Sequence, residues 1–367
     1  MKIVVTGANG FLGKNLCVFL NEVGKYDVVE ITRDTSQARL LSSLAEADFV
    51  YHLAGVNRPD KLDEFQAGNA QLTRSIVDSL IENGRQTPLV LSSSVQAVLD
   101  NPYGRSKLEA EEAVRYYSKV TGSRHYIYRF PNLFGKWSRP NYNSFVATFC
   151  YNTLNDIDIV VNDPSKEVVL AYVDDVCESL IQLLDNKSDY GLQNNFKEYQ
   201  TTVGEVAEII TLFKKGREKL VSERVGTGLI RALYSTYLSF STPNQFTYDV
   251  PVHTDERGIF CEILKTRDSG QFSFFTAYPG VTRGGHYHHT KNEKFLVIRG
   301  SALFRFKNLL SGEVHELTIS GKNTKIVETI PGWVHEISNI GDDELFVMLW
   351  ANEIFDKNKP DTIARSL

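Results

Sequence analysis

The sequence has few cysteines and no long apolar run. Its four cysteines are scattered over 367 residues without a Cys-x-x-Cys pair, at Cys17, Cys150, Cys177 and Cys261. This spacing is typical of free thiols in a reducing compartment and excludes a disulfide framework. No stretch approaches the about 18 uninterrupted apolar residues of a membrane-spanning helix, and MKIVVTGANG reaches turn residues too early for a secretory signal. We therefore predict a cytoplasmic protein without a membrane-inserted segment.

The sequence also lacks a strong excess of positive or negative charge. Lys and Arg number 40 against 45 Asp and Glu, a net charge of −5, which disfavours a sequence-independent nucleic-acid binder. With 42% hydrophobic and 23% charged residues, the composition is that of a folded, soluble protein. At about 150 residues per domain, the length predicts two domains or one large one.

Histidine is distributed unevenly along the chain. Six of the eight histidines follow residue 250: His253, His286, His288, His289, His315 and His335. This asymmetry indicates that the last third of the chain uses imidazole groups.

The first part of the chain, to about residue 240, alternates short apolar strands with amphipathic helical stretches. The expected strands are KIVVT, DVVEIT, FVYHLA, PLVLSS and HYIYRF, and the helices include FLGKNLCVFLNEVG and SKLEAEEAVRYYSKV. Strands that are apolar throughout and separated by helices predict a parallel sheet covered on both faces. The fold class expected here is a doubly wound, Rossmann-like α/β domain over residues 1–243.

The pattern changes after Ser241-Thr242-Pro243-Asn244. Short Phe, Val, Ile and Leu runs punctuated by Gly and Asp follow, such as KFLVIRG, ALFRFKN and LFVMLWA, with little helical periodicity. These runs predict the antiparallel strands of an all-β sandwich or barrel over residues 248–367.

A glycine-rich loop joins the first strand to the first helix. Gly7, Gly10 and Gly13 follow KIVVT directly and precede the apolar helix. Such glycines permit a tight turn and a close approach to a pyrophosphate, and the helix N-terminus supplies amide donors to it. Strand, loop and helix together predict a dinucleotide site, although a plain strand-to-helix connection has the same glycines.

The end of the second strand indicates which dinucleotide binds. NAD binders place an acidic residue there, whereas NADP binders offer a cation to the 2′-phosphate. Here Thr32 stands at the expected position of the acid, with Arg33 beside it. This favours NADPH, unless the register slips by two and Glu30 is the acid.

A tyrosine and a lysine are spaced for proton transfer. Tyr103 and Lys107 are four residues apart at the start of a helix, so the ammonium can lie beside the phenol. A positive neighbour lowers the pKa of a phenol, and we expect Tyr103 to act as acid or base and Ser94 to bind the substrate oxygen. Because Tyr-x-x-x-Lys also arises by chance, a surface Tyr and Lys remain the alternative.

These segments together resemble the extended short-chain dehydrogenase/reductase family over about residues 1–240. TGANGFLG, HLAG, Asn69, SSS before PYGRSK, RFPNLFG and YVDDV occur in the family's order, whereas Val98 and Leu99 replace an aromatic-Gly pair. The resemblance implies Ser94, Tyr103 and Lys107 as the catalytic set and nucleotide-sugars as substrates. It also implies that Tyr103, Lys107 and ten further residues contact the cofactor: Thr6, Gly7, Gly10, Phe11, Leu12, Gly13, Thr32, Arg33, Leu53 and Ala54.

The C-terminal histidines are spaced as metal ligands. His286 and His288 alternate on one expected strand, Glu293 follows, and His335 stands on a later strand pair. Three imidazoles and a carboxylate make a four-ligand site for a divalent transition metal. The pattern resembles the cupins over about residues 248–367, which implies a small jelly-roll barrel; histidines that only line its pore are the alternative.

Two segments of this region, 253–260 and 280–287, look like strands of deoxysugar 3,5-epimerases, which are cupins acting on 4-keto sugars. Those epimerases generally lack a complete metal set, so the chain resembles a hybrid. His253, His315 and Lys291 are each candidates for the epimerase base and are each more often structural.

The whole arrangement resembles the two-domain reductase and cupin epimerases of capsular polysaccharide synthesis. The resemblance implies a UDP-linked 4-keto-6-deoxy-N-acetylhexosamine substrate, C3 epimerisation, NADPH reduction at C4, zinc, and a UDP-2-acetamido-2,6-dideoxy-talose product on the route to UDP-N-acetyl-L-fucosamine. We expect a homo-oligomer, with a dimer favoured. Two alternatives stay open: a reductase whose cupin only binds sugar or mediates assembly, and a regulatory protein that binds NADP without turnover.

Overall fold

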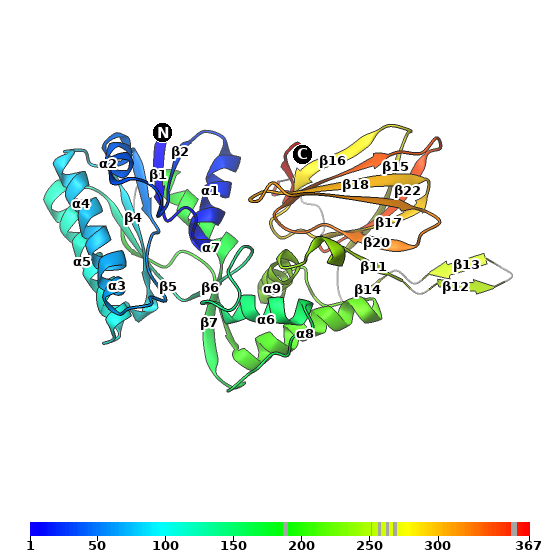
Figure 1. The fold of residues 1–367 in the computed structure, drawn as a ribbon, viewed down its shortest axis with the longest axis horizontal. Helices are drawn as coiled ribbons and strands as arrows, with labels where there is room; N and C mark the ends of the chain where they lie inside the picture. Colours follow the sequence, from blue (N-terminus) through cyan, green and yellow to red (C-terminus); the bar gives the residue numbers. More distant parts are fainter. Residues whose placement is uncertain (186–189, 251, 256–257, 262–263, 267–269, 354–357) are drawn as a thin grey trace. The chain divides into compact units, whose positions relative to one another are not determined.

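The computed structural model describes residues 1–185, 190–250, 252–255, 258–261, 264–266, 270–353 and 358–367 (Figure 1). Contacts divide the chain into two compact units. The N-terminal unit comprises Met1–Ser144 and Val168–Gln200, and the C-terminal unit comprises Phe145–Glu167 and Thr201–Leu367. Helix gives way to strand between Ser239 and Thr247, near the expected boundary, but the contacts group the helices before that point with the C-terminal unit.

The N-terminal unit is built on a six-stranded parallel sheet of order β2-β1-β3-β4-β5-β8. The strands in that order are Asp27–Ile31, Lys2–Thr6, Phe49–His52, Leu89–Ser94, His125–Phe130 and Gly191–Gln193. Apolar side chains on both faces of the strands are buried, which is why the strand sequences lack alternation. The predicted Rossmann-like architecture is confirmed.

Helices cover both faces of this sheet (Figure 1). α1 (Phe11–Val23) and α7 (Val173–Asp185) contribute to one apolar cluster. The other cluster contains side chains of α2 (Gln37–Glu46), α4 (Leu72–Glu82) and α5 (Pro102–Thr121). The unit also contains α3 (Asp63–Phe65), which runs into a π-helical turn at Gln66–Gln71. A small sheet contains β6 (Asn132–Phe134), β7 (Glu167–Tyr172) and β9 (Glu198–Thr202); Glu167, Thr201 and Thr202 of these strands are grouped with the C-terminal unit.

Local sequence defines both ends of α5, the helix of Tyr103 and Lys107. Asn101 caps its N-terminus by accepting a hydrogen bond from the Gly104 amide at 2.8 Å, and Pro102 occupies the first helical position. Gly122 ends the helix in the left-handed conformation, with φ +73°. α5 has 20 residues and carries charges along its length. Across the described part of the chain, no helix is long and apolar enough to cross a membrane.

The C-terminal unit combines three helices with an all-β sandwich. The helices are α6 (Phe145–Leu154), α8 (Val203–Lys219) and α9 (Gly228–Ser239). One five-stranded sheet contains β11 (Thr247–Asp249), β20 (Lys325–Glu328), β17 (Glu293–Arg299), β22 (Leu345–Ala351) and β15 (Gln271–Ala277). The other contains β19 (Val314–Ser320), β18 (Ser301–Asn308), β21 (Trp333–Asn339), β16 (Thr282–Tyr287) and β23 (Ile363–Ala364).

The sandwich is antiparallel, as predicted, and buries an apolar core that includes Phe295, Phe304 and Val347. Its shape differs from the expected barrel in one respect. Among the described strands, no ladder joins the two five-stranded sheets, so the barrel is not closed. Two further short pairs are β10 (Val221–Ser222) with β14 (Lys265–Thr266), and β12 (Val252–Asp255) with β13 (Gly258–Cys261).

Candidate functional site

The glycine-rich loop is too tight for larger residues. Gly7 has φ +70°, and a Cβ placed on it would lie 2.6 Å from the Ala54 amide nitrogen. A Cβ on Gly13 would overlap the Gly7 carbonyl oxygen, which accepts a hydrogen bond from the Gly10 amide at 2.8 Å. The glycines thus hold the loop close to the end of β3 and to the first turn of α1.

The first turn of α1 is suited to binding an anion. Gly10 is its N-cap and supplies no side-chain hydrogen bond, and the first turn contains no acidic residue. Phe11 and Leu12 pack on the sheet core, which fixes the direction of the helix. Free amides and the positive end of the helix dipole suit a pyrophosphate, so these residues fit a dinucleotide.

The chain beyond β2 carries the candidate selectivity residues. Ile31, opposite Thr6, is the last paired residue of β2, and Thr32 and Arg33 follow it. Glu30 is paired inside the strand, opposite Val5. The Arg33 side chain is exposed, so its guanidinium is accessible to a ligand phosphate.

A buried hydrogen-bond chain links the loop to the helical turn at Gln66–Gln71. Thr6 Oγ1 lies 2.7 Å from His52 Nδ1, and His52 Nε2 lies 2.9 Å from Thr73 Oγ1, which donates to the Asn69 carbonyl oxygen at 2.7 Å. Because the Thr73 proton is engaged, His52 donates through Nε2 and accepts through Nδ1. Burial lowers the pKa of His52 to about 3, which keeps the ring neutral.

The same chain positions the end of β3. The Leu53 and Ala54 amides donate to the carbonyl oxygen and Oγ1 of Thr6, at 3.2 and 3.3 Å. Sequence reasoning missed His52, although a histidine in an otherwise apolar strand was a visible signal.

Tyr103, Lys107 and Ser94 come from neighbouring segments of the N-terminal unit. Tyr103 and Lys107 share a face of α5, with the Lys107 Nζ 5.9 Å from the Tyr103 ring centroid. The Lys107 ammonium donates to the Ser92 carbonyl oxygen at 3.0 Å. Ser94 ends β4 and its Oγ accepts from the Gln96 amide at 3.2 Å. The Tyr103 hydroxyl donates to Asn57 Oδ1 at 3.1 Å, a contact that no sequence pattern indicated.

The pKa shifts of this pair correct one expectation. Burial raises the pKa of Tyr103, partly opposed by Ser94, so the expected lowering by Lys107 is wrong for this arrangement. Lys107 does not lower the pKa of Tyr103 because its ammonium points to the Ser92 carbonyl rather than to the phenol oxygen. Burial also lowers the pKa of Lys107 to about 8, partly offset by the Glu111 carboxylate.

Asn69 holds the chain next to Lys107. Its side chain accepts from the Val56 amide at 2.9 Å and donates to Ser106 Oγ at 3.0 Å. A Cβ on Gly55 would lie 2.8 Å from Asn69 Oδ1 and 3.0 Å from the Lys107 Nζ, so a larger residue would displace the ends of these side chains. Asn69 lies in the π-helical turn, a distortion common at functional sites.

The structure brings the four predicted metal ligands together. His286 lies on β16, His288 just beyond it, Glu293 at the start of β17 and His335 on β21. One ligand atom from each falls within 4.8 Å of the others. Glu293 Oε2 is 3.3 Å from His288 Nε2 and 3.5 Å from His335 Nε2. Residues from both sheets of the sandwich therefore converge on one point.

The electrostatics of the cluster fit a divalent metal. Burial lowers the pKa of His286 to about 4 and also lowers the pKa of His335, so both rings are neutral. Burial alone would raise the pKa of Glu293, but its hydrogen bond with His288 holds that pKa well below its usual value. In the described part of the chain, both ring nitrogens of His335 are buried without a hydrogen-bond partner. Neutral imidazoles beside an ionised carboxylate are the donor set of transition-metal sites.

The candidate bases differ in their relation to this cluster. Lys291 Nζ is 2.8 Å from Glu293 Oε1, on the side of the carboxylate away from the imidazoles. His315 pairs with Phe306, which pairs with His335, so all three occupy one cross-strand row. The side chain of His253, and the neighbouring Glu256 and Arg257, lie outside the described residues.

Comparisons with known proteins cover the whole chain. Residues 3–196 match the NAD dependent epimerase/dehydratase family, and residues 253–363 match the polysaccharide biosynthesis C-terminal domain. The UDP-2-acetamido-2,6-beta-L-arabino-hexul-4-ose reductase of Pseudomonas aeruginosa is 53% identical over 368 residues, covering 100% of this chain and 99% of the relative. The capsular polysaccharide assembling protein CapF of Staphylococcus aureus superposes with a TM-score of 0.69 at 40% identity, covering 100% of both chains.

A more distant likeness concerns the fold alone. The UDP-glucuronic acid 4-epimerase of Bacillus cereus has a TM-score of 0.52 at 19% identity and covers 59% of this chain and 84% of its own. The resemblance to two-domain capsule enzymes that the sequence suggested is confirmed over the full length. With a family match over more than half of its residues and a full-length relative, the chain belongs to the NAD dependent epimerase/dehydratase family.

Proposed function

We propose that this chain is a bifunctional nucleotide-sugar enzyme of capsular polysaccharide synthesis. Its cupin domain epimerises C3 of a UDP-4-keto-6-deoxy-N-acetylhexosamine, and its reductase domain reduces the C4 ketone with NADPH to give UDP-2-acetamido-2,6-dideoxy-talose. The observation that carries the proposal is the 53% identity, over the whole chain, to a reductase named for a UDP-linked hexul-4-ose. The Tyr103–Lys107 pair and the His/Glu cluster supply residues for the two steps.

In the reduction, residues of this chain donate one proton to the substrate. The glycine-rich loop would hold a reduced nicotinamide cofactor, which would be the source of the hydride for C4. Tyr103 gives its hydroxyl proton to the oxygen that becomes the alcohol, and Ser94 hydrogen-bonds the same oxygen. For Lys107, cationic below its pKa of about 8, to stabilise the phenolate that remains, its ammonium has to turn from the Ser92 carbonyl toward the phenol oxygen during the reaction. The raised pKa of Tyr103 suits an acid, because the phenol stays protonated until the substrate oxygen accepts the proton.

The preference for NADPH rests on the end of β2. An exposed Arg33 offers a cation to a 2′-phosphate, and Thr32 lacks the carboxylate that would repel it. Thr32 and Arg33 are the first two residues beyond the strand, where the ribose of a dinucleotide binds in this fold.

In the epimerisation, a base removes a proton from the carbon next to the ketone, and a proton returns on the other face. His286, His288, Glu293 and His335 would hold a divalent metal, zinc in our proposal, and that metal would supply Lewis-acid chemistry or structural support for the site. His315 and Lys291 are the candidate bases whose positions are described. Epimerisation must come first, because reduction of the ketone removes the acidity of the C3 proton.

The domain bounds, the cellular location and the oligomeric state are also part of this proposal. We place the reductase domain at residues 1–243 and the cupin domain at 248–367, in a cytoplasmic homo-oligomer, with a dimer favoured. Light scattering after size exclusion tests the assembly, and a monomer at all concentrations contradicts it.

The decisive experiment supplies NADPH and a panel of UDP-4-keto sugars in deuterated water. We expect absorbance at the NADPH band to fall and deuterium to appear at C3. Reduction without exchange, unaffected by metal removal, would favour a reductase whose cupin only binds sugar or mediates assembly. No hydride transfer with any keto sugar would favour a regulatory protein.

A further inference from the structure

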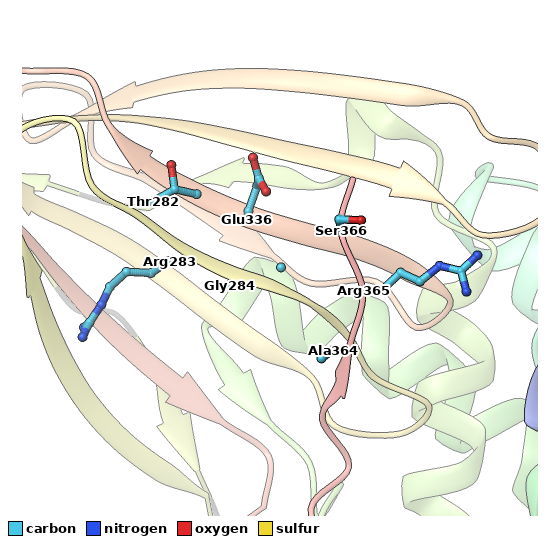
Figure 2. A pocket seen from close by; sticks show the side chains of 8 residues that line it. Thr282, Arg283, Gly284, Glu336, Ala364, Arg365 and Ser366 are labelled. Atoms are coloured by element: carbon cyan, nitrogen blue, oxygen red, sulfur yellow. The ribbon is translucent and has the colours of Figure 1, made fainter. Parts of the chain in front are cut away.

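The last residues of the chain return to the metal ligands. In the segment 358–367, which we call the C-terminal strap, Ile363 and Ala364 form β23 and pair with Tyr287 and His286. Beyond them, the Arg365 amide donates to the Gly285 carbonyl oxygen at 2.8 Å. Figure 2 shows Ala364, Arg365 and Ser366 beside β16, at the groove that both segments line. The strap therefore adds a strand next to the ligand His286.

One partly buried carboxylate of the strap holds the loop between two ligands in place. Asp361 Oδ1 accepts from the His289 amide at 2.9 Å, and its Oδ2 accepts from the amides of Thr290 and Lys291, both at 2.6 Å. The Thr290 hydroxyl also donates to Oδ2, at 3.0 Å. Three consecutive amides and a hydroxyl on one carboxylate fix the backbone of this loop. The loop begins at His288 and ends at Glu293, so its shape sets the spacing of these two ligands.

The main chain of the same residue contacts a ligand directly. The Asp361 carbonyl oxygen accepts a hydrogen bond from His288 Nδ1. A carbonyl only accepts, so Nδ1 carries a proton and Nε2 is the nitrogen that would bind a metal. That nitrogen faces Glu293 Oε2 at 3.3 Å. Outer hydrogen bonds of this kind fix the tautomer and ring orientation of metal-binding histidines.

We propose that Asp361 is a positioning residue for the metal, and that the C-terminal strap is an integral part of the metal site rather than a tail. This inference rests on the proposed metal site and goes beyond it, because it assigns a role to a residue that is not a ligand. The strap acts on His286 by strand pairing, on His288 through the Asp361 carbonyl, and on Glu293 through the loop.

The expected consequence is a loss of metal affinity. Replacing an outer-shell partner of a metal ligand typically weakens binding by roughly 10- to 100-fold. Asp361→Asn keeps the shape but turns one acceptor into a donor that faces amide donors, so we expect an effect in this range. Thr290→Val removes only the hydroxyl hydrogen bond and keeps the three amide contacts, so we expect a smaller loss than for Asp361→Asn.

The test measures binding without relying on activity. The full-length chain, Asp361→Asn and Thr290→Val are stripped of metal and titrated with Zn²⁺ against a chromophoric chelator, well below their unfolding temperatures. Co²⁺ loading then gives a visible spectrum that reports the geometry of the ligands. Asp342→Asn, an exposed aspartate on the turn between β21 and β22, is the matched control.

We expect Asp361→Asn to bind Zn²⁺ 10- to 100-fold more weakly and to change the Co²⁺ spectrum, with Asp342→Asn like the parent chain. A merely structural role would lower the unfolding temperature but leave the spectrum and affinity of the folded protein unchanged, and that result overturns the inference. If the parent chain binds a metal and both Asp361→Asn and Thr290→Val bind it equally well, only the inference fails. If the parent chain takes up neither Zn²⁺ nor Co²⁺, the proposed metal site fails and this inference with it.

Discussion

Replacing Tyr103 with Phe separates the two proposed steps. The phenol oxygen makes one described hydrogen bond, to Asn57 Oδ1 at 3.1 Å. The ring packs against Phe65 with centroids 5.4 Å apart and lies 5.9 Å from the Lys107 Nζ, and phenylalanine keeps both contacts. The variant therefore loses the proton donor while its packing is preserved.

The two effects of Tyr103→Phe differ greatly in size. Loss of one hydrogen bond at a half-buried position costs about 0.5–1.5 kcal/mol at most. In a domain of this size that lowers the unfolding temperature by roughly 2–4 °C per kcal/mol. Loss of a general acid typically lowers the rate by roughly 10²- to 10⁴-fold, or about 2.7–5.4 kcal/mol in activation free energy. The catalytic loss should therefore be about two to ten times the stability loss.

The assay follows NADPH absorbance and deuterium incorporation at C3 in the same sample. We expect oxidation of NADPH by Tyr103→Phe to fall at least about 100-fold, while deuterium exchange continues at the parent rate. Tyr116→Phe is the matched control, since Tyr116 lies on the same helix with 57% of its surface exposed. A variant that retains more than about a tenth of the reductase rate refutes the role of Tyr103. One that loses exchange as well refutes the division between the sites.

Three further predictions concern the cofactor, the pH profile and the metal. Arg33→Asp should reverse the preference from NADPH to NADH, because a carboxylate repels the 2′-phosphate and accepts from the ribose hydroxyls; an unchanged ratio of kcat/KM values means that Arg33 does not reach the ribose. The kcat/KM of reduction should fall as the pH rises through about 8, where Lys107, with its pKa lowered by burial, loses its charge; a rate that rises there contradicts this. Chelation or His288→Ala should stop deuterium exchange at C3 but leave reduction of an already epimerised keto sugar unchanged. Exchange at C3 in metal-free protein would show that the His/Glu cluster has no role in epimerisation.

Much of both sites could be predicted because their signals are local in sequence. The glycine spacing determines the loop, since only glycine avoids the clash at Gly13. The four-residue spacing of Tyr103 and Lys107 places them on one helix face wherever the helix lies. His286, His288 and Glu293 fall within eight residues, so strand pairing needed to add only His335.

What could not be predicted depends on contacts between distant segments. Asp361 reaches His288 across 73 residues, and no local pattern marks it as different from any other aspartate near a chain end. The pKa of Tyr103 was misjudged for a related reason: helix spacing shows that Lys107 is near, but not that its ammonium points to the Ser92 carbonyl. The open sandwich likewise depends on which strand edges pair, and strand periodicity alone does not contain that information.

The chemistry of a 4-keto sugar explains why the proposed steps would be carried on one chain. The ketone makes the C3 proton acidic, and its reduction ends that acidity, so the reductase fixes whichever C3 configuration reaches Tyr103. A reductase faster than the epimerase would therefore release the wrong stereoisomer unless it discriminates in kcat/KM between the two ketones. Equal production of the two sites in one polypeptide keeps their ratio constant at every expression level, which separate proteins cannot ensure. In the proposed scheme, the product ratio would then depend on metal occupancy of the cupin, because chain with an empty cluster would still carry Tyr103 and Lys107 and would still reduce the ketone.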